Sequence, residues 1–424
     1  MHLFLLLVLL LVVVVVVGFA LVAVSKPQKS PSRPLAESNS KLSPNSGLTK
    51  NQSLKQRQQK LYKENNSPKS RVASFFAQLE QRNYCIAVLR CHTEQVVCFA
   101  FHPKNRCLVS CSSDRSVRIW WDPVDRQAKF SSVNLFTLAA SEDGVKFPDS
   151  AVACCWKKDG QSILFALNYT RAIRAYDISE NQKVVAGSLD VISPQKNTVK
   201  DIDVDPLLRY FLTYDDSSTF VVWNMRGTIL TSVDTHQVKI NQVAISADGR
   251  FVASAGFIAD VYIWEVLFQK DNGEFLGLNK VMDLKGHHAG VTGVAFSRDN
   301  KLATVCKDRT IRVWNIEVRY KLGEDAKLLF SLDPWDTQVD LLHVTFSPKG
   351  DLLAVAGNDS VAFYSLDTRQ VVTVLRQCTG RTTVDIKKFG FSGDGTLLAT
   401  LGQGQQWISL WNIPAMPSLS SVHP

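Results

Sequence analysis

Residues 286–315 read GHHAGVTGVAFSRDNKLATVCKDRTIRVWN. Two apolar runs, 291–296 and 301–306, lie on either side of a short polar turn, and a third run ends at Trp314. Val, Ile and Thr favour strands, whereas Ser, Asp and Asn favour turns. The stretch therefore predicts three short strands joined by tight turns.

The same pattern occurs seven times between residues 84 and 413. In each copy a polar turn is followed, about 18 to 20 residues later, by an aromatic side chain, and the copies succeed one another at intervals of about 41 to 55 residues. The aromatic residues are Trp120, Tyr176, Trp223, Trp264, Trp314, Tyr364 and Trp411. Constant spacing within a copy indicates three tightly connected strands, and variable spacing between copies indicates a fourth strand with loops of varying length. The sequence therefore predicts an all-β, seven-bladed β-propeller over residues 84–413.

The repeat resembles the WD40 family, most clearly in the copies that end at Trp314 and Trp120. The resemblance implies a structural tetrad in which His, Ser or Thr, Asp and Trp bond in series. The expected tetrads are His92–Ser110–Asp114–Trp120 in blade one and His287–Thr304–Asp308–Trp314 in blade five. The other five blades depart from this pattern: Thr170, Ser217 and Asn358 stand at the Asp position, and Asp260 comes two places late.

Two chemical alternatives compete with the structural interpretation. His287 beside Asp308 could form a catalytic pair, and Cys107 and Cys111 near His92 could form a metal cluster with His102. Recurrence of the pattern in blade one favours architecture. The sequence contains no nucleophile elbow, phosphate-binding glycine loop or His-Glu-x-x-His motif. We therefore expect no enzymatic activity, cofactor, metal ion or small-molecule substrate.

A strand-like run, Tyr84–Arg90, precedes the first turn, and Pro414 ends the last copy soon after Trp411. The run at 84–90 is expected to complete the last blade, because an unpaired sheet edge promotes aggregation.

Residues 3–24 form an apolar run without a charged side chain, which is long enough to span a bilayer as a helix. Four basic side chains follow within about 17 residues, and only the amino group and His2 precede the run. Because the positive flank stays in the cytosol, the sequence predicts a single transmembrane signal anchor with the propeller on the cytosolic side. A signal cleaved near Ala23 is the alternative, which would give a lumenal or secreted propeller.

The formal net charge of +9 is concentrated in residues 25–72, which hold eleven Lys and Arg against two acidic side chains. This segment is rich in Ser, Lys, Gln, Asn and Pro, so we expect a basic disordered linker. It could bind anionic lipid headgroups, bind RNA weakly, or serve only as a spacer that sets the topology. Residues 73–83 are expected to form a short helix or connector, and residues 414–424 a C-terminal tail. The nine cysteines lack a disulfide framework, which fits free thiols in the cytosol.

This layout, together with residues 250–320, resembles WD40 proteins anchored in the endoplasmic reticulum. The resemblance implies a scaffold that binds proteins on the cytosolic face of that membrane, with a stress-responsive translation kinase or mRNA as partners. The chain departs from them because it ends soon after blade seven without a helical extension, and partners that need the extension are not implied.

Propellers bind partners through loops at the blade edges. Five side chains next to the Asp turns are therefore the candidate protein-binding rim: Ser113, Arg115, Asp216, Lys307 and Arg309.

Overall fold

The computed structural model describes residues 85–90, 92–124, 130–134, 138–140, 146–178, 184–191, 197–378 and 384–413. The anchor expected at 3–24, the linker at 25–72, the connector at 73–83 with Tyr84, and the tail at 414–424 lie outside the described residues and stay predictions. Among the residues that are described, no helix has the length and apolar character that a bilayer crossing requires.

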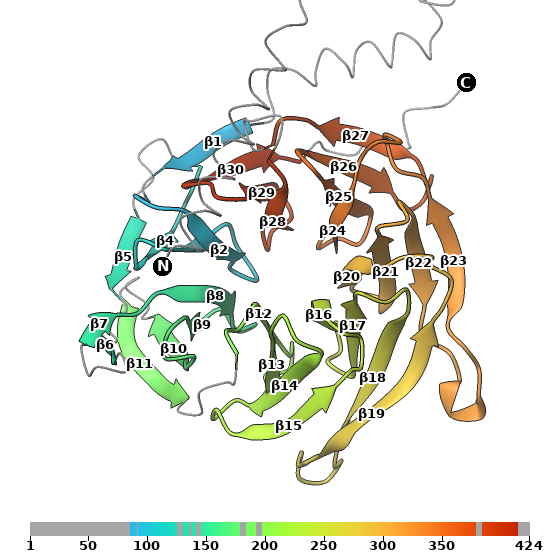
Figure 1. The fold of residues 1–424 in the computed structure, drawn as a ribbon, viewed down its shortest axis with the longest axis horizontal. Coiled ribbons are helices and arrows are strands. Elements are labelled where there is room, and N and C mark those ends of the chain that lie inside the picture. The colour runs from blue at the N-terminus through green and yellow to red at the C-terminus, as the bar shows by residue number, and fades with distance from the viewer. Residues whose placement is uncertain are drawn as a thin grey trace, which may run out of the picture. The chain divides into compact units, whose positions relative to one another are not determined.

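Seven four-stranded antiparallel sheets surround a central axis, as the repeat predicts (Figure 1). The strands of blades one to three are β2 (Val96–Phe101), β3 (Leu108–Ser112), β4 (Ser116–Trp120) and β5 (Phe130–Asn134); β8 (Ala151–Trp156), β9 (Ser162–Leu167), β10 (Ile173–Ile178) and β11 (Val184–Val191); and β12 (Asp201–Val204), β13 (Tyr210–Tyr214), β14 (Thr219–Asn224) and β15 (Ile229–Asp234).

Blades four to seven follow the same order from the axis outward. Their strands are β16 (Ile240–Ile245), β17 (Phe251–Gly256), β18 (Val261–Phe268) and β19 (Phe275–Leu284); β20 (Val291–Phe296), β21 (Lys301–Cys306), β22 (Ile311–Asn315) and β23 (Lys327–Leu332); β24 (Leu341–Phe346), β25 (Leu352–Gly357), β26 (Ser360–Ser365) and β27 (Val371–Leu375); and β28 (Ile386–Phe391), β29 (Leu397–Gly402), β30 (Trp407–Asn412) and β1 (Cys85–Arg90).

The closure expected from the sequence is confirmed. Strand β1 pairs antiparallel with β30, with Leu89 opposite Ile408, so the start of the repeat region supplies the outer strand of the last blade. Both side chains belong to one apolar cluster with Val96 and Phe99 of blade one. The ring is therefore closed by backbone pairing and by apolar packing together.

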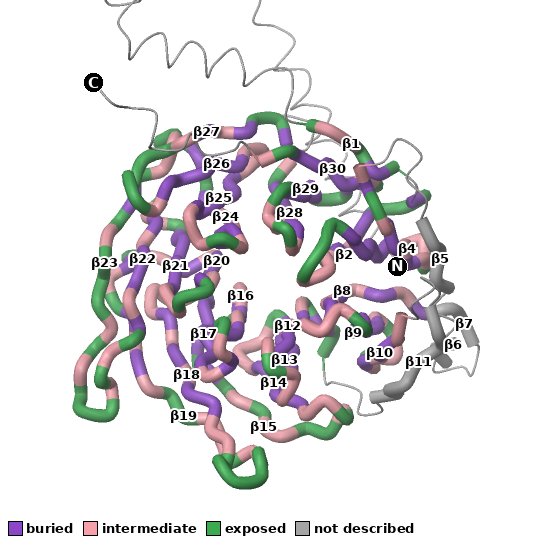
Figure 2. Tube along the Cα trace, turned by 180° about the vertical axis from the view of Figure 1, so that it is seen from behind, coloured by how far each residue is buried: buried purple, intermediate pink, exposed green. Residues whose placement is uncertain are grey.

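The core lies between the blades. Seven apolar clusters each join two neighbouring blades, and together they run around the whole ring. The second strands of the blades are consequently buried on both faces, and every residue of β9, β17, β25 and β29 is buried. Figure 2 shows this burial along the inner strands, with exposed segments at the loops.

Two features of the chain account for the longest repeat intervals. A small hairpin, β6 (Leu138–Ala140) and β7 (Lys146–Pro148), lies between β5 and β8 and was not expected from the sequence. Strand β19 has 10 residues and lengthens blade four.

One 3₁₀ turn, η1 (Tyr320–Leu322), leads toward β23 and is the helical element of the described residues.

Candidate functional site

One end of the ring carries the loops between blades and the turns between the second and third strands of each blade. Successive turns of an antiparallel meander alternate between two ends, so these segments share one end, which we call the upper rim. The tetrad residues hold the upper-rim loops against the strands.

The blade-one tetrad is assembled, but its order differs from the expected series. The His92 Nδ1 lies 3.0 Å from an Asp114 carboxylate oxygen, and its Nε2 lies 2.8 Å from the Ser110 hydroxyl. The Trp120 indole N–H donates to the same hydroxyl at 3.1 Å. Asp114 is thus a terminal partner, and Ser110 is the central link between His92 and Trp120. The expectation that the Asp joins Ser110 to Trp120 is wrong, because the Asp turn lies above the imidazole.

Blade five repeats this geometry. His287 Nε2 lies 2.7 Å from the Thr304 hydroxyl, which also accepts the Trp314 indole N–H at 3.0 Å. The other ring nitrogen lies 2.9 Å from the Thr310 hydroxyl and 3.4 Å from Asp308. Both nitrogens of the ring are therefore engaged within the blade.

Burial lowers the pKa of His287 to about 4, against the opposing charge of Asp308. Burial alone would raise the pKa of Asp308, but hydrogen bonds from Thr310 and from the His288 amide hold it well below its usual range. The pair therefore combines a neutral imidazole with a carboxylate already satisfied by donors. Burial also raises the pKa of the neighbouring Cys306 thiol to about 11, so the cluster offers no activated nucleophile.

The same side chains are also unsuited to binding a metal ion. Among the residues that the structure describes, one set of possible metal ligands lies close together. It consists of His287, Cys306 and Asp308, whose ligand atoms lie within 4.8 Å of one another. A metal ion would need a free imidazole lone pair, and both nitrogens of His287 face hydroxyls. We therefore assign the cluster to the blade-five tetrad.

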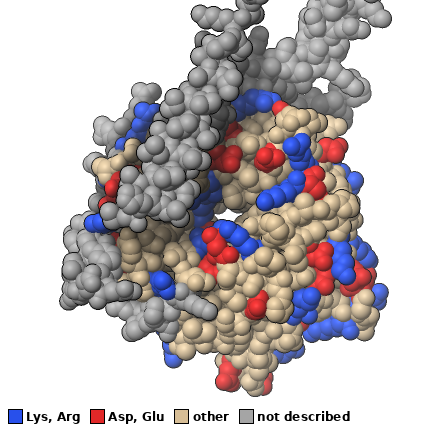
Figure 3. Space-filling view, viewed as in Figure 1, with Lys and Arg blue, Asp and Glu red and all other residues tan. Residues whose placement is uncertain are grey.

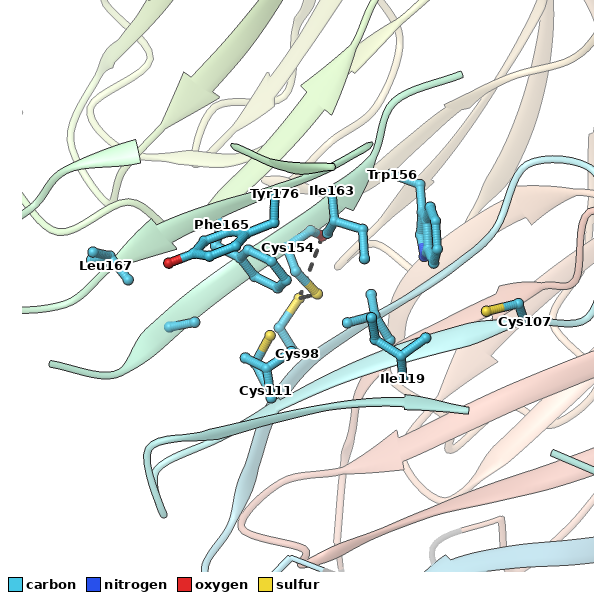
Figure 4. Close-up of a cluster of buried hydrophobic side chains, with 13 residues drawn as sticks. Cys98, Cys107, Cys111, Ile119, Cys154, Trp156, Ile163, Phe165, Leu167 and Tyr176 are labelled. Atoms are coloured by element: carbon cyan, nitrogen blue, oxygen red, sulfur yellow. Dashed lines mark hydrogen bonds between the residues drawn. The ribbon is translucent and has the colours of Figure 1, made fainter. Parts of the chain in front are cut away.

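The alternative cluster of Cys107 and Cys111 with two histidines does not assemble within the described part of the chain. Cys107 is buried in the layer between blades one and two, where burial raises its pKa to about 12. In the same layer Cys98 and Cys154 face each other with a sulfur–sulfur distance of 3.6 Å, while Cys107 lies apart (Figure 4). Cys107 packs as a small apolar group, and Cys98 also lies 3.3 Å from the Lys388 ammonium.

Sequence reasoning missed several polar links in the other blades. An indole N–H also donates to a hydroxyl in blades three, four and seven, from Trp223 to Thr213, Trp264 to Ser254 and Trp411 to Thr400. The detectable signal is a Ser or Thr ten or eleven residues before the closing Trp. Blades two and six close with Tyr, and strand pairing places the apolar Phe165 and Val355 at the corresponding positions.

Two further residues replace the tetrad histidine. In blade two the buried Asp149 accepts bonds from the backbone of Tyr169 and from the amide and hydroxyl of Thr170. In blade four the buried Gln237 donates its amide to the backbone of Ser254 and Asp260. The expected departures at Thr170 and Asp260 therefore still anchor their turns, through different donors.

The candidate rim residues occupy the upper-rim turns of three blades. Arg115 and Arg309 stand at the same place of their turns, with φ values of 66° and 64°. Arg309 binds the Thr337 carbonyl and lies 3.7 Å from Asp340. Ser113 is half-buried, and its N–H donates to the Gln95 carbonyl.

Asp216 and Lys307 are the other two members of this set. Asp216 is 67% exposed and lies 3.3 Å from Lys200 and 3.1 Å from Lys239. Burial would raise its pKa, but these ammonium groups lower it, so the carboxylate stays charged. Lys307 is exposed, with its ammonium 5.7 Å from the Phe257 ring centroid.

The axis of the ring holds a cavity of about 580 Å³. Lys388 of β28 reaches Asp201 of β12 within it, with both nitrogen–oxygen distances 3.0 Å. Burial lowers the pKa of Lys388, but Asp201 outweighs burial and raises it well above its usual range. This ion pair ties blade seven to blade three. Figure 3 shows the central opening with acidic and basic side chains around it.

Comparison with known proteins agrees with this geometry. The family described as "WD domain, G-beta repeat" matches residues 83–120, 227–265 and 278–315. The human transducin beta-like protein 2 is 28% identical over 320 residues, which cover 74% of this chain and 69% of that protein. The mouse protein of the same name is 28% identical over 281 residues, and this chain spans less than two thirds of it, 62%. The rat telomerase protein component 1 is 22% identical over 301 residues, or 10% of its length.

The repeat, the seven blades, the tetrads and these similarities agree. The chain is a WD40 repeat protein that resembles transducin beta-like protein 2.

Proposed function

We propose that the chain is a non-enzymatic scaffold, tethered to the cytosolic face of the endoplasmic reticulum by residues 3–24, whose propeller binds partner proteins. One observation carries the protein-binding part. The side chains that could take part in catalysis, such as His287 and Asp308, are hydrogen-bonded within their blade. By contrast, Asp216 and Lys307 are exposed on the upper rim. WD40 propellers generally bind proteins through such loops.

The finer part of the proposal concerns the pathway. The sequence layout of apolar anchor, basic linker and propeller resembles that of reticulum-anchored WD40 proteins, and this supports a role in stress-responsive translation or unfolded-protein signalling. A stress-responsive translation kinase is therefore the first partner to test.

Protease protection on microsomes tests the topology. With a tag at the C-terminus, added protease should destroy the propeller without detergent, because the propeller faces the cytosol. A protected propeller would contradict the tether orientation. Asn168 and Asn358 stand in Asn-x-Ser/Thr sequons, which are glycosylated in the lumen. If glycosidase treatment changes the gel mobility of the protein, and Asn168→Gln and Asn358→Gln abolish that change, the lumenal alternative is established.

Affinity capture from the same cells tests the scaffold. The full chain and a variant without residues 1–72 should capture overlapping sets of proteins, because the propeller carries the rim. Charge reversal at Asp216, Lys307 and Arg309 should remove part of that set. A set unaffected by the reversal would exclude this rim as the binding surface.

A second candidate, RNA association, rests on the concentration of the whole +9 charge in residues 25–72. Phosphate contacts by Lys and Arg make binding strongly dependent on salt. RNA recovered by ultraviolet cross-linking should therefore vanish without residues 25–72, while captured proteins remain. RNA retained by the propeller alone would exclude the linker as the RNA-binding element.

A further inference from the structure

A strained turn stands on the upper rim between β15 and β16. Val238 has a φ of 65°, and the N–H of Lys239 donates to the Gln237 carbonyl at 2.7 Å. This is a three-residue turn with a positive φ at its centre, which is rare and strained. A β-branched residue is especially unfavourable in this conformation. The position would suit glycine, and the chain has valine instead.

The turn is held firmly from below. Gln237 is fully buried, and its side-chain amide donates to the backbone carbonyls of Ser254 at 3.1 Å and Asp260 at 2.9 Å. Val238 itself is 72% exposed, so burial within the chain does not offset the strain. Strained backbone maintained by its surroundings is concentrated at functional sites. The cost of an exposed, strained valine would be offset where a ligand covers it.

A second exposed apolar side chain lies on the adjoining turn. The N–H of Phe257 donates to the Lys239 carbonyl at 2.9 Å, and the Phe257 side chain is 60% exposed. Gly256 permits this approach, because a Cβ there would lie 2.6 Å from the Lys239 carbonyl oxygen and 2.8 Å from the Gln237 Cβ. The backbone thus brings two apolar residues onto neighbouring turns.

The surrounding charge is positive. Lys307 places its ammonium 5.7 Å from the Phe257 ring, and Lys239 shares the Asp216 carboxylate with Lys200. Two ammonium groups therefore share the Asp216 carboxylate, and a third, that of Lys307, lies beside Phe257. We call Val238, Lys239, Phe257 and Lys307 the Val238 patch.

We propose that the Val238 patch binds a short acidic segment of a partner protein that carries an apolar side chain between its carboxylates. The apolar side chain would cover Val238 and Phe257, and the carboxylates would meet Lys239 and Lys307. This inference rests on the proposed function, since it names the partner's chemistry at the same rim.

The charge of the patch also decides between occupants. The chain's own segment 25–72 is strongly basic and would be repelled by Lys239 and Lys307. A bilayer surface would bring its anionic headgroups against the open carboxylates of Asp216 and Asp340, which are 67% and 65% exposed. A narrow acidic peptide avoids both conflicts.

The test uses the purified full chain in detergent and fluorescent peptides with a central Leu, Phe or Trp. One set has Asp and Glu on both sides of the apolar residue, and the matched set has Ser and Lys. The acidic set should bind, and Val238→Gly should weaken binding about tenfold while leaving the unfolding midpoint at or above that of the unchanged chain. Lys307→Glu should weaken binding and reduce its salt dependence.

Leu207→Ser is the control, because Leu207 is an exposed apolar residue on a turn at the opposite end of the ring. It should leave peptide affinity unchanged. Equal binding by the Val238→Gly variant, equal binding of the basic peptides, or binding only to vesicles containing anionic lipid would overturn the proposal. If proteins are still captured from cells by the Val238→Gly variant, this patch fails while the scaffold function stands. If the full chain captures none, the proposed function itself fails.

Discussion

Blades five and six have the same strand order and nearly the same burial, yet only blade five has the full polar tetrad. In blade five Thr304 receives the Trp314 indole and faces His287. In blade six the corresponding residue is the buried Val355, and the Tyr364 hydroxyl donates to the Asp333 carbonyl at 2.8 Å. The blade therefore forms without the tetrad.

The difference separates two tasks. Strand pairing and the apolar layers between blades, such as the cluster shared by blades five and six, produce the architecture. The tetrad satisfies the polar groups that a Trp and a His bring into that layer, and it fixes the rim loop above. Where Trp is replaced by Tyr, as at Tyr176 and Tyr364, no indole N–H needs the buried hydroxyl, and the apolar Phe165 and Val355 stand in its place.

Deleting residues 84–90 should have the largest effect on the stability of the propeller. The deletion removes β1, exposes the edge of β30 and opens the apolar cluster around Leu89. We expect loss of the cooperative thermal transition, measured by circular dichroism. Deleting seven residues from the 25–72 segment is the control and should leave the transition in place. An unchanged transition in the first variant would show that β1 does not close the ring.

Thr304→Val should come next. It leaves the buried His287 nitrogen and the Trp314 indole N–H without their shared partner, at a cost of about 2–4 kcal/mol in the free energy of unfolding. Urea denaturation measures the loss. A loss below about 1 kcal/mol would mean that the blade-five tetrad contributes little stability.

Acidification should destabilise blade five through His287. Its pKa is about 4 in the folded chain and 6.5 as the ordinary value, so between these pH values the unfolded chain binds the proton and the folded chain does not. The free energy of unfolding should therefore fall as pH decreases, by about 2 kcal/mol from this group between pH 7 and pH 5. Urea titrations at both pH values measure it. His287→Gln should flatten the dependence, and an unaltered slope would show that this histidine is not the titrating group.

Tyr364→Phe should have the smallest effect. It removes one partly buried hydrogen bond to the Asp333 carbonyl and leaves the apolar ring in place. A loss of about 0.5–1.5 kcal/mol in urea denaturation is expected. If this loss matched that of Thr304→Val, the claim that the polar contacts of blade five contribute more stability than those of blade six would be contradicted.

The repeat spacing predicted the blade number, the strand order within blades and the closing strand, because apolar strands and turn residues recur locally in the chain. The order of the tetrad was not predictable, since it depends on how the Asp114 turn folds over His92. The roles of Asp149 and Gln237 were not predicted, because neither side chain resembles the histidine that it replaces. The Lys388–Asp201 pair joins residues that only ring closure brings together.

The five candidate rim residues lie on upper-rim turns, and their role in protein binding stays a prediction; Val238 was not identified among them from the sequence. The strain at Val238 arises from its positive φ, which cannot be inferred from the presence of a valine in a polar loop. Phe257 lies within residues 250–320, which carry the family resemblance, and only the fold shows that its backbone lies against Lys239.

Lysine-reactive cross-linking of captured complexes, followed by mass spectrometry, tests the central claim most directly. Lys200, Lys239 and Lys307 stand on the upper rim, whereas Lys104 and Lys349 stand on turns at the opposite end, and all five are exposed. If partners bind the upper rim, the cross-links to them should concentrate on Lys200, Lys239 and Lys307. Cross-links concentrated on Lys104 and Lys349 would contradict the assignment of protein binding to this rim.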